Sequence, residues 1–391
     1  MKHTFLFSLL LVLGAQQIAK AQTDNRRVVV TGVPFLMISA DARASGLGDQ
    51  GVATRVDAFS QQWNPAKYVF SEAQQGVALS YTPYLREIAD DINLAQLTYF
   101  NRFDERSSVS ASLRYFGLGG VELRETASQV PREVEPNEFA LDVSYALRLS
   151  DMFSMAVTGR FIRSDLKIPS GISDASAANT FAADISMFYQ GEEKVYKDFN
   201  GRWRAGASIS NIGPKIKYDD AGSENFLPTN FKAGVGFDFI LDAANTIGVF
   251  AEVNKLLVPT PPKLEVDDDG NLTEQSQNDL NDYNNTNEFS GIFSSWGDAP
   301  DGFSEELKEF TWALGAEYWY EDSFALRVGY FNESEDKGYR KYMTIGAGFK
   351  YSSITIDASY LFSTSPVQNP LEGTLRFGLT FNINSGAYYE Y

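Results

Sequence analysis

The feature that most constrains this fold is an alternation of apolar and polar residues that recurs along the chain. In 371–383, leucine, phenylalanine and isoleucine take one set of alternate positions, and charged, hydroxyl and amide side chains take most of the other. The segments 353–362 and 139–149 repeat the pattern. A period of two places successive side chains on opposite faces of a β-strand. The pattern therefore predicts strands with one apolar and one polar face.

Fourteen segments show this pattern and are predicted to be strands. They cover residues 75–84, 93–103, 106–117, 137–149, 153–166, 178–190, 202–211, 230–240, 246–256, 308–320, 324–332, 340–350, 354–363 and 371–383. Most are longer than the five or six residues that are usual in globular proteins, and long enough to cross a bilayer at a tilt.

The connections between these segments alternate between short and long. Short turns lie near 104–105, 150–151, 242–243, 321–322 and 352–353, a longer turn covers 191–201, and long loops cover 118–136, 167–177, 212–229 and 257–307. This arrangement is typical of outer-membrane barrels, whereas the strands of a soluble β-sandwich are usually shorter. We expect an all-β fold, a transmembrane antiparallel up-and-down β-barrel of about 14 strands.

The N-terminal residues have the organisation of a secretory signal peptide. A basic start at 1–3, an apolar run at 5–15 and an A-x-A site at 19–21 predict cleavage after Ala21, and the run is too short for the competing reading as a membrane helix. Residues 22–74 lack long alternation, and 33–38 are too apolar for a disordered tail. We therefore predict a signal peptide (1–21), an N-terminal plug segment (22–74) and an outer-membrane barrel (75–391), with periplasmic termini and extracellular long loops.

The composition excludes most catalytic chemistry. The chain has no cysteine, and its only histidine, His3, belongs to the signal peptide. Nucleophilic sites that need His or Cys, and zinc sites of the usual kind, cannot be built. Cleavage removes Lys2 and Lys20, which takes the formal net charge from −18 to −20, and so acidic a chain would be repelled by nucleic acid. We predict no enzyme activity, no cofactor and no metal site.

The polar faces of the predicted strands carry nearly balanced charge. The predicted inward-facing set comprises Arg114, Arg148, Arg160, Arg204, Lys232, Arg327 and Arg376 with Asp142, Asp184, Asp238, Glu252, Glu317 and Asp357. An open ion-selective pore more often favours one sign. The balance predicts salt-bridged networks across the barrel or against a plug.

The stretch Ser45-Gly-Leu-Gly-Asp-Gln-Gly51 has the G-x-G-x-x-G spacing of dinucleotide-binding loops, with glycines at Gly46, Gly48 and Gly51. That fingerprint needs a preceding buried strand and an acidic residue about twenty positions later. Neither is present, so we interpret the glycines as turns that let the plug lie close to the barrel wall.

The loop 257–307 is acidic and carries four apolar residues of interest. Its Asp267–Asn271 stretch fits an EF-hand poorly, because position twelve is Ser276 and no helix pattern flanks it, so a solvated turn is the better interpretation. Ile292, Phe293, Trp296 and Phe303 either fold back over the barrel mouth or contact a partner. We favour a partner.

Residues 41–67 resemble the N-terminal signature of the FadL-like outer-membrane barrels. The resemblance rests on the glycine run, on the pair Asp57-Ala58 and on the triplet Asn64-Pro65-Ala66. The stretches Asp41-Ala-Arg-Ala44 and Trp63-Asn-Pro-Ala-Lys67 look most like the PorV family, which belongs to the type IX secretion system of Bacteroidetes.

The resemblance implies a binding function rather than catalysis. PorV-like proteins are described as partners of the large translocon barrel, SprA (Sov). They receive cargo by its C-terminal domain and pass it to the surface attachment machinery, which includes the sortase PorU. The alternative is a FadL-like passive transporter of long-chain hydrophobic compounds. In that case Gly117, Gly119 and Gly120 either form a bulge in the wall or serve the extracellular loop. A general porin is disfavoured by the predicted plug.

Overall fold

The computed structural model describes residues 27–86, 89, 91–123, 130, 132–166, 177–218, 224–267, 269–365 and 371–383. The predicted signal peptide lies outside the described residues. No helix in this described part is long and apolar enough to cross a membrane.

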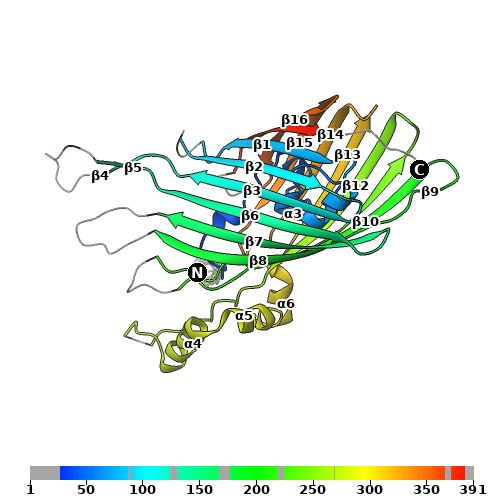
Figure 1. Cartoon of the computed structure of the whole chain (residues 1–391). Helices are drawn as coiled ribbons and strands as arrows, with labels where there is room; N and C mark the ends of the chain where they lie inside the picture. The colour runs from blue at the N-terminus through cyan, green and yellow to red at the C-terminus, as the bar shows by residue number, and fades with distance from the viewer. Residues whose placement is uncertain are drawn as a thin grey trace, which may run out of the picture.

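Fourteen long strands form one closed antiparallel barrel, which confirms the predicted fold class (Figure 1). They are β1 Gln75–Pro83, β2 Asn93–Arg102, β3 Ser107–Gly117, β6 Asn137–Arg148, β7 Phe153–Asp165, β8 Ala178–Gln190, β10 Asn200–Ile212, β11 Asn230–Ile240, β12 Asn245–Leu256, β13 Phe310–Tyr320, β14 Phe324–Asn332, β15 Lys341–Tyr351, β16 Ile354–Ser363 and β17 Leu375–Ile383. Each strand pairs with its neighbours in sequence, and β17 pairs with β1 to close the ring. Every predicted strand segment coincides with one of these strands.

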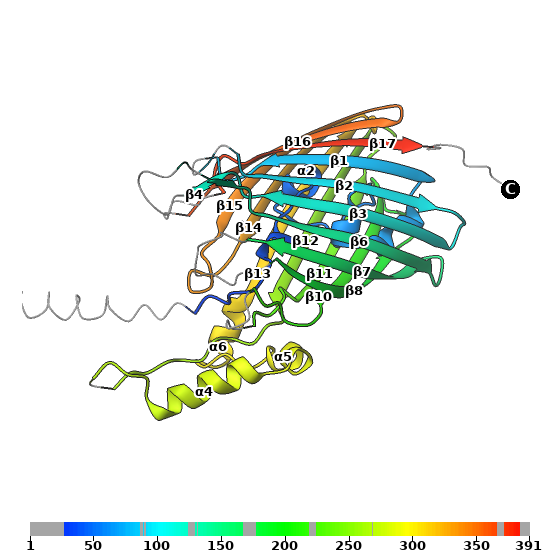
Figure 2. The ribbon, with the colours of Figure 1, turned by 60° about the vertical axis from the view of Figure 1, so that its left-hand side comes forward.

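Three short strands accompany the barrel, of which β4 (Val121–Leu123) and β5 (Arg132–Val134) form a separate two-stranded sheet. The hairpin of β4 and β5 continues beyond β3 and β6, and β9 (Lys194–Val195) pairs with β10 inside the predicted long turn. We call the end of the barrel with β4 and β5 the long-loop end and the opposite end the short-turn end (Figure 2). The pairing of β3 with β2 and β6 is regular through Gly117, and Gly119 and Gly120 lie beyond the end of β3. The register instead shifts between Ile209 and Ile212 of β10.

The two faces of the wall have the polarity of a membrane barrel. Apolar side chains such as Leu97, Val143 and Phe181 are exposed on the outside, and polar ones such as Gln96, Asp142 and Thr180 are buried inside. Tight turns at the short-turn end contain residues in the left-handed backbone conformation, including Asp322 and Ser352. The alternation seen in the sequence thus separates a lipid-facing belt from a polar lumen.

Residues 27–74, which we call the plug segment, run through the lumen from the long-loop end to the short-turn end (Figures 1 and 2). The segment contains η1 Pro34–Met37, α2 Ala42–Ser45, α3 Ser60–Trp63 and η2 Pro65–Phe70. It enters where Gly32 N–H donates to the Phe226 carbonyl and continues into β1 at Gln75. Asp41 caps α2 by accepting two backbone N–H bonds, and proline opens η1 and η2.

The loop between β12 and β13 is helical, which corrects the prediction that no helix flanks the acidic turn. It holds α4 Glu274–Asn285, α5 Glu288–Ser294, α6 Phe303–Glu306 and η3 Leu307–Glu309. We call residues 257–309 the helical loop. Thr273 and Asn287 cap α4 and α5 through their side chains. These side-chain caps therefore stabilise the starts of α4 and α5, whose sequences have little apolar periodicity.

The two ends of the described chain lie at opposite ends of the barrel. Arg27 contacts Asp301 and Glu305 of the helical loop at the long-loop end, whereas β17 ends at the short-turn end. This differs from the expectation that both termini lie on one side. The plug segment crosses the lumen before β1 begins, and this crossing puts Arg27 and Ile383 at opposite ends.

Candidate functional site

The predicted glycines of the plug segment touch the barrel wall. Gly48 has a φ of 85°, its N–H donates to Thr344 Oγ1 at 3.0 Å, and a Cβ there would lie 2.9 Å from the Tyr330 carbonyl oxygen. A Cβ on Gly46 would lie 3.1 Å from Gly346 Cα. Gly48 needs to be glycine both for its left-handed backbone and for this approach, whereas Gly46 needs only the space.

Gly51 and Asn64 fasten the middle of the plug segment. The N–H groups of Gly51 and Val52 both donate to Glu252 Oε2 of β12 at 2.9 Å. Asn64 is fully buried, and its Nδ2 donates to the carbonyls of Val52 and Met187. Its Oδ1 accepts the N–H of Ala66, so the amide group holds the plug, the wall and the start of η2 together.

Pro65 and Ala66 begin η2 close to the wall. Both residues are buried, and the Ala66 carbonyl accepts a hydrogen bond from Ser154 Oγ of β7 at 2.6 Å. Ala66 also packs with Ala146, Ala156 and other small or aromatic side chains. The triplet Asn64-Pro65-Ala66 therefore acts as one attachment point.

A buried charge network connects the plug segment to three strands. Arg43 donates to Glu317 of β13 through Nε and Nη2, both at 2.9 Å, and to Asp57 Oδ2 at 2.7 Å. Glu317 also accepts from Arg327 of β14 at 2.6 Å, and Arg327 donates to Asp357 of β16 at 2.6 Å. This arrangement confirms the predicted salt-bridged network against a plug.

Other lumen charges pair across neighbouring strands. Arg160 of β7 binds Asp142 of β6 and Asp184 of β8, at 2.6 and 2.9 Å. Arg204 binds Asp238, which also accepts from Arg55 of the plug segment at 3.1 Å. All predicted inward-facing charges are buried except Lys232 and Arg148. The Lys232 ammonium lies 4.4 Å from the Trp63 ring centroid, and Arg148 binds carbonyls of the adjacent turn.

An apolar cluster lies in the long-loop half of the lumen. Val33, Phe35 and Leu36 of the plug segment pack against lumen-facing side chains that include Leu94, Phe116, Ala140 and Ile162. Phe35 and Phe116 stack with ring centroids 6.3 Å apart. The plug thus fills this space with its own apolar residues, as expected from the composition of 33–38.

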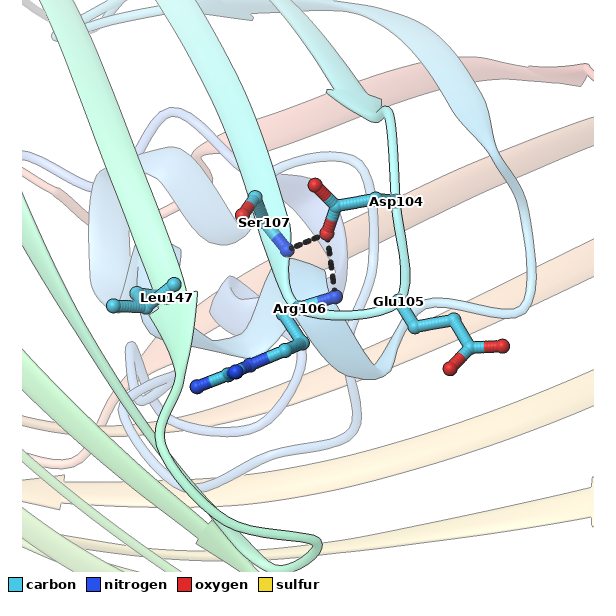
Figure 3. Close-up of a pocket in the computed structure, with 5 residues that line it drawn as sticks. All are labelled: Asp104, Glu105, Arg106, Ser107 and Leu147. Atoms are coloured by element: carbon cyan, nitrogen blue, oxygen red, sulfur yellow. Dashed lines mark hydrogen bonds between the residues drawn. The ribbon is translucent and has the colours of Figure 1, made fainter.

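Two hollows lie at the short-turn end. One, of about 340 Å³, is lined by charges of both signs, but Arg55 and Arg204 in its wall already bind Asp238. The other is open and lies at the β2–β3 turn (Figure 3). There Asp104 Oδ1 accepts the N–H groups of Arg106 and Ser107 at 2.6 Å, so its carboxylate closes the turn. We assign no ligand to either hollow.

Several aromatic residues of the helical loop are exposed at the surface. Phe293 and Phe303 are 78% and 77% exposed, Phe289 and Trp296 are also exposed, and Ile292 is half-buried. The small residues Gly291 and Ser295 face inward instead, with Gly291 against Pro259. A surface helix normally buries its apolar stripe, so α5 is inverted and presents an aromatic surface. We call Phe289, Phe293, Trp296 and Phe303 the aromatic surface.

The aromatic surface is continuous with the outer wall of the barrel. The Trp296 ring lies 5.5 Å from that of Phe231 on β11 and 6.2 Å from that of Phe310 on β13. On β13, the aromatic side chains of Trp312 and Tyr320 are also exposed. The helical loop therefore extends an apolar belt beyond the strands.

Ion pairs hold α6 against the N-terminal end of the plug segment. Arg27 binds Glu305 and Asp301, each at 2.6 Å, and Lys337 binds Glu305 at 2.7 Å. Burial alone would raise the pKa of the Glu305 carboxyl, but the hydrogen bonds from Arg27 and Lys337 outweigh it and lower the pKa to about 2. Sequence reasoning missed these contacts, because Arg27 and Glu305 are 278 positions apart.

The sequence matches one protein family, and the structure is similar to solved structures of one fold. The family model described as type IX secretion system protein PorV matches residues 21–263, more than half of the chain. No curated protein matches the sequence.

Three solved structures illustrate the similarity of fold. The toluene transporter TbuX of Ralstonia pickettii is 11% identical with a TM-score of 0.46, over 89% of this chain and 100% of that chain. The toluene transporter TodX of Pseudomonas putida is 9% identical with a TM-score of 0.47, over 92% and 100%. A Pseudomonas aeruginosa FadL homologue is 12% identical with a TM-score of 0.45, over 88% and 99%.

Proposed function

The chain belongs to the PorV family of type IX secretion system proteins, and from this premise we propose that it is the cargo-binding barrel of that system in the outer membrane. In this proposal it binds secreted cargo by its C-terminal domain at a translocon barrel of the SprA (Sov) type. It then passes the cargo to an attachment complex of the PorU type. Its long loops are extracellular, and its apolar belt contacts outer-membrane lipid.

The observation that carries the proposal is the exposed aromatic surface beside a filled lumen. The plug segment crosses the whole barrel and is fixed by buried ion pairs, which favours a function on the outside of the molecule. Phe293 and Phe303 are large, exposed and close to the long-loop end. Exposed aromatic residues are the side chains most often used as anchors in protein–protein interfaces. We therefore assign the cargo or translocon contact to the aromatic surface.

A second candidate is passive transport of long-chain fatty acids or other hydrophobic compounds. The apolar cluster around Val33 and Phe35 lines the long-loop half of the lumen, and the strand register shifts in β10 between Ile209 and Ile212. The plug segment occupies this space, so transport would require Pro34–Met37 to leave it. Fold alone does not choose between the two functions.

A deletion strain distinguishes them. Both release of cargo with a C-terminal domain and uptake of long-chain fatty acids are measured after complementation with wild type and with Phe293→Ser/Phe303→Ser. The proposal predicts that the double variant releases much less cargo than wild type, since each anchor contributes on the order of 1 kcal/mol or more to binding. Val195→Ser is the matched control, because Val195 is 84% exposed but lies at the short-turn end. Normal cargo release with lost uptake in the deletion strain would overturn the proposal.

A further inference from the structure

A cluster of carboxylates lies between the helical loop and the outer wall of the barrel. Lys255, near the end of β12, is almost completely buried there, with its ammonium nitrogen 2.6 Å from carboxylate oxygens of both Glu306 and Glu309. Asp298 completes the cluster. One carboxylate oxygen from each of the three acids lies within 4.8 Å of the other two. This spacing is compatible with oxygen ligands that share one metal ion at 2.3–2.6 Å, the range for calcium.

Glu306 has one carboxylate oxygen without a partner in this cluster. Its side chain is buried, 5% exposed as a residue, and its Oε1 lies 2.6 Å from the Lys255 ammonium nitrogen. Its Oε2 is buried and has no hydrogen-bond partner among the described residues. Asp298 Oδ1 is also buried and unpartnered within the described part of the chain. Buried carboxylate oxygens without a partner are costly, and a bound cation is one way of compensating them.

The local charge has an excess of two negative units. Arg27, Lys255 and Lys337 are the cations that pair with this group. They face five acids, namely Asp298, Asp301, Glu305, Glu306 and Glu309. A single divalent ion would neutralise the difference.

We propose that Asp298, Glu306 and Glu309 bind one calcium ion that fastens the helical loop to the barrel wall. The ligands are all oxygens and the mature chain has neither His nor Cys, which selects a hard cation over zinc or copper. The site is irregular and shares its carboxylates with lysines, and calcium tolerates irregular coordination better than magnesium does. The ion would sit at the base of the aromatic surface, away from the acidic turn near Asp267.

Isothermal titration of the full-length mature protein in detergent micelles with calcium chloride tests the site. We expect one calcium per chain, a loss of at least tenfold in affinity for Glu306→Gln, and a smaller loss for Asp298→Asn. The control Asp267→Asn/Asp269→Asn removes two charges from the exposed turn and should leave the affinity unchanged. Unchanged binding in Glu306→Gln, or no stoichiometric binding by wild type, would overturn the proposal.

A second measurement guards against a variant that fails to fold. Limited proteolysis of the helical loop should be slowed by calcium in wild type and insensitive to calcium in Glu306→Gln, while both proteins retain the gel mobility of a folded barrel. Proteolysis that responds equally to calcium in the two proteins contradicts the site. Both assays use purified protein without cargo, so their outcome is independent of the secretion proposal.

Discussion

Arg43 of the plug segment and Glu317 of β13 form a bidentate ion pair inside the barrel, with both nitrogen–oxygen distances at 2.9 Å. Both side chains are buried, and Arg327 binds the same carboxylate from the next strand. One barrel acid therefore holds the plug and the wall together.

Replacement of Glu317 by glutamine is expected to destabilise the protein by about 3–5 kcal/mol, because it leaves two buried guanidinium groups without their shared carboxylate. Glu193→Gln is the control, since Glu193 pairs with Arg202 at the surface, where ion pairs contribute little. Denaturant unfolding in detergent micelles measures the free energy of unfolding of the two variants. Equal midpoints for the two variants would show that the Arg43–Glu317 pair does not stabilise the plug.

Gly48→Ala should cost more than backbone strain alone. Gly48 and Gly270 have similar positive φ values of 85° and 82°, but only Gly48 has wall atoms within 4 Å of an added Cβ. Gly270→Ala is therefore expected to lower the free energy of unfolding by about 1–2 kcal/mol at most, because alanine is strained in the left-handed conformation. The same unfolding assay should show a larger loss for Gly48→Ala, and similar losses would contradict close contact between the plug and β14.

The attachment of α5 should weaken in acid. Glu288 accepts backbone N–H bonds from its own residue and from Lys215, and these lower the pKa of its carboxyl below the ordinary 4.5. A carboxyl with a lowered pKa in the folded state stabilises that state above the unfolded pKa, and the contribution disappears as the pH falls below about 4.5.

Hydrogen exchange of the helical loop, followed by mass spectrometry at pH 6 and pH values below 4, measures this effect after correction for intrinsic rates. Wild type should be better protected than Glu288→Gln at pH 6, and the difference should shrink in acid. A difference that stays constant with pH would exclude titration of Glu288 as its cause.

The strands and the inward-facing charges follow from the sequence because both depend on a local period of two. Alternation alone predicts that Asp142 and Glu317 face the lumen, and both are buried. Which charges would pair was not predictable, since Arg43 and Glu317 are 274 positions apart and meet only when the barrel closes around the plug.

The helical loop shows a different limit of sequence reasoning. Residues 274–285 are polar on almost every side, so no apolar stripe marks α4. Its helix depends on the Thr273 cap and on contacts such as Tyr283 against Phe226, with ring centroids 6.0 Å apart. The apolar residues 292, 293, 296 and 303 stand out in the sequence, but their exposure depends on Gly291 facing the protein, which no sequence pattern indicates.

The most direct test of the central claim is to lock the plug segment in place and measure secretion. A Cβ on Gly378 of β17 would lie 3.7 Å from Ala42 Cβ of α2, a separation that suits a disulfide, and the native chain has no cysteine to interfere. Ala42→Cys/Gly378→Cys is introduced into the deletion strain, with each single cysteine variant as a control.

If the protein works as a binding surface around a fixed plug, the oxidised double variant should release cargo as well as wild type does. Loss of cargo release on oxidation, recovered on reduction and absent from the single variants, would contradict this account and show that the plug must move.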